Sequence, residues 1–295
     1  MSTYSIKDLE LLSGIKAHTL RIWEQRYSLL NPKRTETNIR YYDDSDLKLI
    51  LNVALLNDSG LKISKIAKMS LEEIRAEVIK LTDRSLTHDD QIHALTISMV
   101  EMNEDRFDKI LTSNILKIGF EQTMLHVIYP FLNKIGVLWQ TAAINPAQEH
   151  FISNLIRQKL IVAIDGQVVD GEGKKFMLFL PEGELHEISL LFATYVIKSK
   201  GHKVIYLGQS TPMEDLISVY SIVKPDYLLT VFTTTPGMEC VETYVRDLGN
   251  NFKEAQVLVS GFQIIGQDIE LPANVQQLNY LGEIKQVLEQ MNEFV

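Results

Sequence analysis

The feature that most constrains the fold is a change in hydrophobic period near residue 175. Beyond it, short continuous apolar runs alternate with helical stretches of about 10 to 15 residues. The apolar runs lie at 176–180, 204–207, 227–232 and 257–259, and a fifth strand is countable if 275–278 is the last. Buried strands that alternate with helices are typical of a parallel sheet covered on both faces. The sequence therefore predicts a flavodoxin-like, doubly wound α/β domain over 171–295.

The segment before it, 88–170, keeps a helical period throughout. Within it, Asn145, Pro146 and Gln148 form a strong helix start, because Asn can cap, Pro suits the first turn and Gln can close a capping box. Helices of this length predict a four-helix bundle. The polar stretch at 82–87 lacks an apolar face, so 76–87 is predicted as a helix and linker.

The first 75 residues predict short helices and one irregular stretch. Ser5 with Asp8 can start a first helix, Gly14 can end it, and a second helix follows to about Tyr27. The stretch 33–42 is polar and basic, which indicates a loop or a small hairpin, and Asp43, Asp44 and Ser45 each offer a cap for the next helix. Two helices around a tight turn indicate a helix–turn–helix unit.

Charge is divided unevenly between these parts. The net charge of −9 argues against nucleic acid for the chain as a whole, but residues 1–70 carry +3 and the remainder −12. We expect only the basic segment to contact a polyanion, unless the imbalance is a chance fluctuation. One cysteine excludes an intramolecular disulfide and a cysteine-based zinc site, and no run is apolar enough to span a membrane. A soluble cytoplasmic protein is the expectation.

Candidate DNA contacts lie on the second helix and the basic loop. A recognition helix places its first residues in the major groove, and loop cations contact phosphates. Leu20 and Trp23 are expected in the core, and the alternative is a solvated helix face with incidental arginines. The candidates are Thr19, Arg21, Arg26, Tyr27, Lys33, Arg34, Arg40, Tyr41 and Tyr42.

A candidate metal ligand follows the first strand of the sheet. Ligands of doubly wound sheets bind at the carboxyl ends of strands, where His186 is expected and where Glu184 could hold its other ring nitrogen. The alternative is an ordinary surface histidine. Trp139, Glu149 and His150 could cover a flat ligand, although Trp139 could equally be core and Glu149 could simply favour a helix start.

A longer motif runs through the head: HTLRIWEQRY at 18–27, then Leu30, Pro32, Arg34-Thr35, RYY at 40–42 and Asp46-Leu47. In this motif the head resembles the winged helix–turn–helix of the MerR family of transcription regulators. The resemblance implies a dimer on a palindromic operator, with Arg21 and Tyr27 on the recognition helix. Arg34, Arg40 and Tyr41 would lie on the wing.

The remainder resembles a cobalamin-binding Rossmann module, and the bundle is similar to the helical cap of light-sensing, cobalamin-dependent MerR repressors. The resemblance rests on Glu184-x-His186 and on the segments 206–212, 230–233 and 260–261. It implies that His186 is the lower axial ligand of cobalt and that Glu184 orients it. The further residues it implies are Trp139, Glu149 and His150 over the upper face, and Thr230, Ser260 and Gly261 along the nucleotide-tail slot. Ser189 and Ser260 stand where the motifs have glycine.

Together with the resemblance, these features predict a DNA-binding repressor gated by cobalamin that acts as a homodimer or homotetramer. The adenosyl form of the cofactor and a light-dependent step are what the resemblance implies. The cofactor would bind between the helical bundle and the α/β domain. An alternative, favoured by the two serines, is a regulator whose effector domain has lost cobalamin and responds to a protein partner or another small ligand. An enzyme, such as a corrinoid carrier for methyl transfer, is not expected, because no catalytic constellation is visible and the head would be unexplained.

Overall fold

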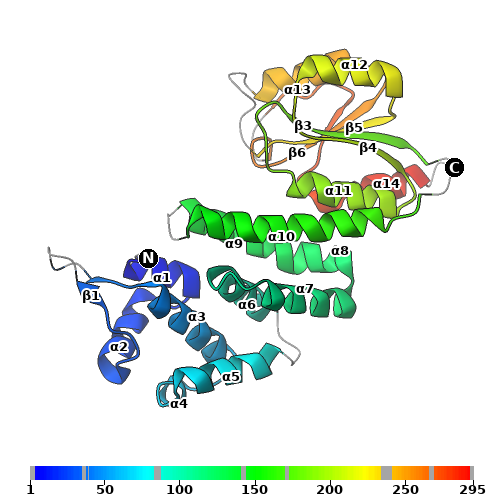
Figure 1. Cartoon of the computed structure of the whole chain (residues 1–295). Helices are drawn as coiled ribbons and strands as arrows, with labels where there is room; N and C mark the ends of the chain where they lie inside the picture. Colours follow the sequence, from blue (N-terminus) through cyan, green and yellow to red (C-terminus); the bar gives the residue numbers. More distant parts are fainter. Residues whose placement is uncertain are drawn as a thin grey trace. The chain divides into compact units, whose positions relative to one another are not determined.

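The structure, a computed structural model, describes residues 4–34, 38, 40–82, 88–140, 144–169, 173–233, 241–265 and 269–292 (Figure 1). The chain divides into two compact units, Met1–Leu155 and Ile156–Val295. Within the described residues, no helix is both long and apolar enough to cross a membrane.

The first unit begins with the predicted helix–turn–helix head. Ser5 and Asp8 cap the first helix reciprocally, and Asp43 and Asp46 cap the third in the same way, which satisfies N–H groups left at a helix start. Gly14 ends the first helix at φ 76°, a conformation that glycine adopts without a Cβ clash. The elements are α1 (Ile6–Ser13), α2 (Ala17–Tyr27), β1 (Lys33–Arg34), β2 (Arg40–Tyr41), α3 (Asp44–Asp58), α4 (Ile63–Ile66) and α5 (Leu71–Thr82).

The basic loop of the head forms the small hairpin that its sequence allowed. Strands β1 and β2 pair antiparallel, with Lys33 opposite Tyr41. Leu20 and Trp23 of α2 are buried, as predicted, so the opposite face of α2 is left to solvent. The expected boundary at residue 75 falls inside α5, which packs against α3.

The helical region follows, as predicted. Its segments are α6 (His88–Val100), α7 (Glu104–Ile118), α8 (Phe120–Thr123), the π-helical turn η1 (Met124–Ile128), α9 (Tyr129–Gln140) and α10 (Pro146–Asp165). Helices α8, η1 and α9 run on without a break, and α6 packs against α7, η1 and α9. Asn145 accepts from the Ala147 N–H and its own N–H donates to Gln148, which confirms the predicted cap. Helix α10 begins in the first unit and ends in the second.

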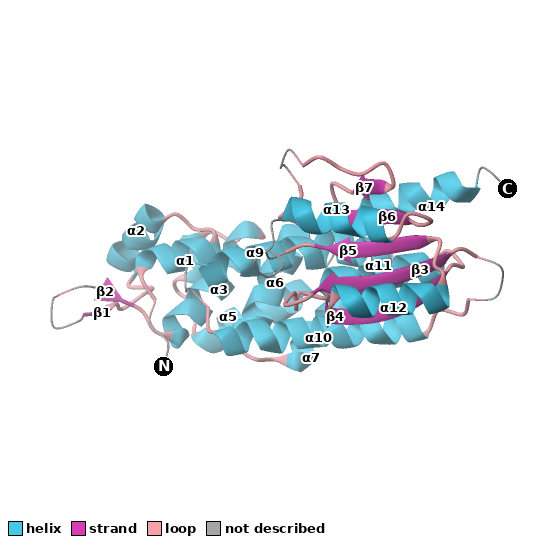
Figure 2. Ribbon diagram, turned by 90° about the horizontal axis from the view of Figure 1, so that it is seen from above, coloured by secondary structure: helices cyan, strands magenta, loops and turns pink. Residues whose placement is uncertain are grey.

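The second unit is a five-stranded parallel sheet (Figure 2). Its strands are β3 (Lys175–Pro181), β4 (Lys203–Thr211), β5 (Tyr227–Val231), β6 (Gln256–Ser260) and β7 (Val275–Gln277). They lie in the order β4-β3-β5-β6-β7, which is the flavodoxin-like order that the sequence predicted. The order reverses between β3 and β5, so the carboxyl ends of these strands form the crevice in which this fold class binds ligands.

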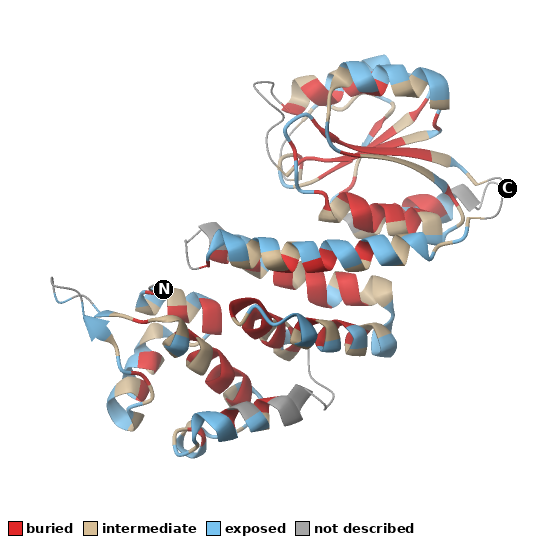
Figure 3. Cartoon of the chain, viewed as in Figure 1, coloured by how far each residue is buried: buried red, intermediate tan, exposed pale blue. Residues whose placement is uncertain are grey.

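Helices cover both faces of this sheet. The helices are α11 (Ile188–Ser199), α12 (Met213–Val223), α13 (Val241–Asn251) and α14 (Ile284–Asn292), with a short 3-10 turn η2 (Leu281–Glu283) before the last. Helices α12 and α13 lie on one face, and α11 and α14 on the other (Figure 1). Strands β3, β5 and β6 and the helix faces toward them are buried (Figure 3), which explains the continuous apolar runs of these three strands. The edge strand β4 is mostly half-buried or exposed.

Candidate functional site

The exposed face of α2 carries the predicted recognition residues. Arg21 and Arg26 are exposed, and Thr19 and Tyr27 are half-buried. The Arg26 guanidinium lies 5.5 Å from the centre of the Tyr27 ring, a cation–π distance. This face therefore offers cations and hydrogen-bond donors on a helix whose other side is anchored in the core.

Arg21 also lines a basic pocket of about 380 Å³ within the head. The pocket joins the start of α1, the helix α2 and the hairpin, and it brings together cations that are far apart in the sequence. Its lining residues are Ser5, Ile6, Lys7, Arg21, Arg34, Asn38 and Arg40. Such a cradle suits a phosphate group, because several donors and positive charges converge on one position. Ser5 and Lys7 were missed from the sequence, where Lys7 is a single cation next to Asp8 in the first turn of α1.

Contacts within the head hold the hairpin cations in place. The Arg34 Nη1 donates to the Asn38 side-chain oxygen at 2.6 Å, and the Arg40 Nε lies 3.6 Å from a Glu24 carboxylate oxygen. Lys33 pairs with Asp43, whose carboxylate raises the pKa of the lysine. Lys33 is thus tied to the cap of α3, whereas Arg34 and Arg40 line the pocket.

Tyr42, which was expected among the DNA contacts, lies in the core of the head. Its side chain is 0% exposed, and its hydroxyl donates to Glu24 at 3.2 Å. Burial beside the Glu24 carboxylate raises the pKa of Tyr42 to about 12. A β-branched, aromatic segment places alternate side chains on opposite faces, so Tyr41 faces outward and Tyr42 inward. Tyr42 therefore supports the hairpin and offers no surface to DNA.

The second site lies just after β3, in the loop before α11. The Glu184 carboxylate is 1% exposed and accepts from the His186 Nδ1 at 2.6 Å and from the backbone N–H groups of Leu185 and His186 at 2.9 and 3.0 Å. Its other oxygen accepts from the Thr233 N–H at 2.9 Å, beyond the end of β5. A buried carboxylate with this many donors is held in one orientation.

The neighbouring strand β4 holds the same loop from the other side. The Ser210 hydroxyl accepts from the Gly183 N–H at 3.0 Å, and the Gln209 amide donates to the Leu185 carbonyl at 2.7 Å. The His186 side chain is 63% exposed at the carboxyl edge of the sheet. With Nδ1 on Glu184, a bond from this imidazole to a metal would use Nε2, which is the arrangement usual for protein-bound histidine ligands.

The other predicted cofactor residues of this unit lie at the ends of β5 and β6 and on α11. The Thr230 hydroxyl is buried and has no hydrogen-bond partner among the described residues. The Ser260 hydroxyl donates to the Leu278 carbonyl at 3.0 Å, so it is turned into the sheet. Gly261 has φ 110°, and a Cβ there would lie 2.3 Å from the Phe232 carbonyl oxygen. Ser189 is half-buried in the first turn of α11.

The residues expected over the opposite face of a ligand belong to the first unit. Trp139 is in α9, and its side chain lies outside the described part of the structure. Glu149 and His150 are in the first turns of α10, where the His150 Nδ1 lies 2.8 Å from a Glu149 carboxylate oxygen. The structure therefore brings Glu149 and His150 together.

Two family models match the chain. Residues 4–73 match the MerR HTH family regulatory protein, and residues 91–163 match a B12 binding domain. The chain thus combines a MerR-type HTH head with a B12-binding domain. The second match covers the helical region, so the assignment of the sheet depends on its strand order and on comparison with solved structures.

Relatives of this MerR regulator support the same assignment over most of its length. It is 27% identical to the transcriptional repressor CarH of Myxococcus xanthus over 232 residues, which are 77% of each chain. It is 28% identical to the repressor CarA of the same organism over 264 residues, 88% of this chain and 86% of that one. Both are named as repressors, in line with a regulator rather than an enzyme. A monomethylamine corrinoid protein of Methanosarcina barkeri shares the fold at a TM-score of 0.54 and 14% identity, over 73% of this chain and 99% of that one.

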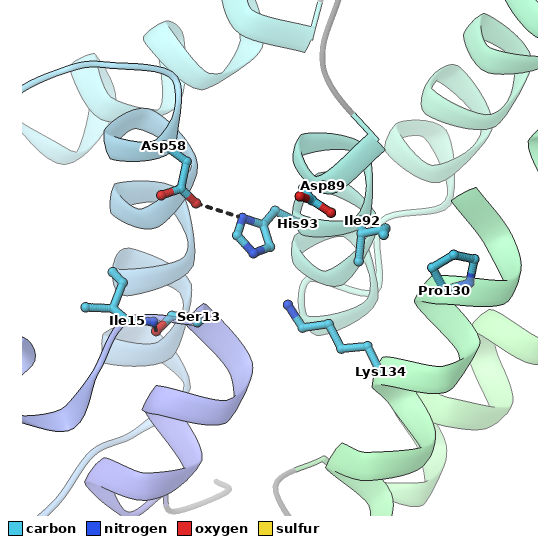
Figure 4. Close-up of a pocket in the computed structure, with 9 residues that line it drawn as sticks. Ser13, Ile15, Asp58, Asp89, Ile92, His93, Pro130 and Lys134 are labelled. Carbon is cyan, nitrogen blue, oxygen red and sulfur yellow. Dashed lines mark hydrogen bonds and ion pairs between the residues drawn. The ribbon is translucent and has the colours of Figure 1, made fainter. Parts of the chain in front are cut away.

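A further pocket of about 410 Å³ lies between the MerR head and the helical region and is lined by residues of both (Figure 4). The His93 Nδ1 lies 3.3 Å from an Asp58 carboxylate oxygen, which joins α3 to α6. Lys134 of α9 and Asp89 of α6 line the same pocket. Burial lowers the pKa of His93, and it lowers that of Lys134 to about 8 although Asp58 and Asp89 oppose this shift. The loss of hydration at Lys134 thus outweighs the attraction of the nearby carboxylates.

Replacing Lys134 with methionine is expected to stabilise the protein by about 1 to 2 kcal/mol at pH 7, because the aliphatic stem is kept and the poorly hydrated charge is removed. Between pH 8 and 10.5 the lysine is already neutral in the folded chain and still protonated in the unfolded chain. The stability of the wild type should therefore rise with pH in this window, and the advantage of Lys134→Met should shrink. Thermal unfolding at pH 7 and 10 measures both effects.

The matched control is Lys117→Met, since Lys117 is exposed on α7 and its removal should change stability little. A Lys134→Met protein that is less stable than the wild type at pH 7 would show that Lys134 makes a net favourable interaction in the pocket.

Proposed function

We propose that this chain is a transcriptional repressor whose hold on its operator depends on cobalamin bound through His186. The observation that carries the proposal is the Glu184–His186 pair, at the carboxyl edge of a flavodoxin-like sheet, in a chain that also matches a B12-binding domain. The named activity of the relatives CarH and CarA supports repression.

The residues of the second unit fit a corrinoid. Cobalt in a corrin ring accepts an axial nitrogen, and an imidazole whose Nδ1 is held by a buried carboxylate is a suitable donor. The buried hydroxyl of Thr230, which has no hydrogen-bond partner among the described residues, is available to a polar group inserted at the end of β5. The inward hydrogen bond of Ser260 means that this serine does not project into the crevice, which weakens the argument that the module has lost its ligand.

The remaining assignments follow from the resemblance. Trp139, Glu149 and His150 of the first unit shield the upper face of the cofactor, and Thr230, Ser260 and Gly261 line the slot for its nucleotide tail. The Ser189 hydroxyl, which stands where the motif has glycine, hydrogen-bonds to that tail. The adenosyl form of cobalamin is the proposed ligand, and light is the proposed signal that releases it.

The head supplies the DNA contacts in this proposal. The pocket lined by Arg21, Arg34 and Arg40 receives a backbone phosphate, while Thr19 and Tyr27 on the face of α2 lie in the major groove. Two heads bind a palindromic site, so the functional protein is a homodimer or homotetramer. Cofactor binding shifts the population of the oligomer that places its heads at operator spacing, and the affinity for DNA changes with it.

The test is operator affinity as a function of cofactor and light. The probe is a DNA duplex selected from a random library by the wild-type protein. We expect binding to tighten at least about tenfold with adenosylcobalamin in the dark, which corresponds to about 1.4 kcal/mol of coupling, and to weaken after illumination. Equal affinity with and without adenosylcobalamin, in the dark and after light, would refute cobalamin gating.

A further inference from the structure

The residue after His186 carries a second buried carboxylate that the proposed site does not use. Glu187 is 7% exposed, and both of its carboxylate oxygens are engaged. One accepts from the Arg157 Nε at 2.5 Å, and the other accepts from the Tyr206 hydroxyl at 2.8 Å. Arg157 comes from α10 and Tyr206 from β4, so three elements meet at this one side chain.

Helix capping does not explain the burial of Glu187. It stands at the N-cap of α11, but its side chain makes no hydrogen bond to the helix start. A buried carboxylate is costly unless charged and neutral donors compensate it, and here a guanidinium and a phenol both do so. Hydrogen bonding to Glu187 raises the pKa of Arg157, while burial together with this hydrogen bond raises that of Tyr206.

Along the chain, His186 is flanked by two carboxylates, Glu184 and Glu187, that are each held by hydrogen bonds. On one side, Glu184 binds the backbone N–H and the ring of His186. On the other, Glu187 is tied to α10 and to β4. Arg157 also lies inside the segment 91–163 that matches the B12-binding family, so the contact joins that helical segment to the histidine loop.

We propose that Glu187 is a positioning residue for His186: through Arg157 and Tyr206 it sets where the imidazole is presented and makes that position depend on α10. The inference rests on cobalamin binding as proposed above. A metal bond tolerates little displacement of its ligand, and outer partners of a ligating histidine commonly affect metal affinity by about 10- to 100-fold. Loosening Glu187 should therefore weaken the cobalt–imidazole bond without removing the imidazole.

The experiment uses full-length protein and hydroxocobalamin as the probe, in the wild type, Glu187→Gln, Tyr206→Phe and Arg157→Gln. The visible spectrum reports imidazole coordination, which is titrated against cofactor concentration and then against falling pH. We expect a dissociation constant about 10- to 100-fold higher in Glu187→Gln, and loss of the imidazole-coordinated spectrum at a higher pH than in the wild type. The control is Lys203→Gln, which removes an exposed cation at the amino end of β4, whereas the histidine loop lies at the carboxyl end of the sheet. This variant should match the wild type.

Two further variants separate positioning from general stability. Arg157→Lys restores a cation and should recover part of the lost affinity. In a His186→Ala background, Glu187→Gln should cause no additional loss, because its effect passes through the imidazole. Variants that melt earlier as apoprotein but keep the wild-type dissociation constant and pH midpoint would overturn the inference. A wild type that binds no cobalamin would instead overturn the proposed function, and the inference with it.

Discussion

His186→Ala protein is expected to bind cobalamin at least about 100-fold more weakly than the wild type and to lose the spectrum of an imidazole-coordinated corrinoid. The variant removes the only nitrogen that the Glu184–His186 pair presents to a metal, whereas loss of an outer partner alone costs about 10- to 100-fold. Because the side chain is 63% exposed, the apoprotein should unfold at nearly the wild-type temperature. Titration with hydroxocobalamin followed by desalting measures the loss.

The matched control is His126→Ala, which removes another exposed histidine, in the π-helical turn of the helical region. It should bind cobalamin like the wild type. A His186→Ala protein that keeps wild-type cofactor stoichiometry and spectrum would show that cobalt takes its axial ligand elsewhere.

The second large effect is expected at the basic pocket of the head. Arg21→Gln should weaken binding to the selected duplex by about 10- to 100-fold, because each of two heads loses an interaction worth about 1 kcal/mol or more. If Arg21 contacts phosphate, the slope of log affinity against log salt should fall by about one for each head. Fluorescence anisotropy over a range of salt concentrations gives both quantities.

Lys117→Gln, which removes an exposed cation of α7, is the control for net charge and should leave affinity and slope unchanged. Wild-type affinity and slope in Arg21→Gln would remove the pocket from the DNA interface. A large loss confined to one base position, with an unchanged slope, would instead make Arg21 a base-reading residue.

Local signals explain why much of the fold could be predicted from the sequence. The caps at Ser5, Asp43 and Asn145 each involve residues three positions apart, and the structure contains all three. Strands β3, β5 and β6 were visible because strands buried on both faces need continuous apolar runs. The last helix, α14, was missed although Ile284, and Val287 and Leu288 after it, carry a helical period.

The contacts that define the sites are long-range, and periodicity does not contain them. Tyr42 and Glu24 are 18 positions apart, and Arg157 and Glu187 are 30 apart. The sequence could therefore predict the pairing of His186 with Glu184, which are two residues apart. It could not show that Glu187 contacts both α10 and β4, or that Lys7 and Arg21 line one pocket. Tyr42 was misassigned for the same reason, since its outward or inward direction depends on the hairpin.

The central claim is that the imidazole of His186 is bonded to the cobalt of bound cobalamin. The most direct test is the electron paramagnetic resonance spectrum of the protein loaded with cob(II)alamin, recorded with ordinary protein and with protein whose histidines carry nitrogen-15. The account predicts that the triplet splitting from one axial nitrogen becomes a doublet on histidine labelling, and that His186→Ala abolishes it. A triplet that survives the labelling would contradict the account, because the ligand would then be a nitrogen of the cofactor itself.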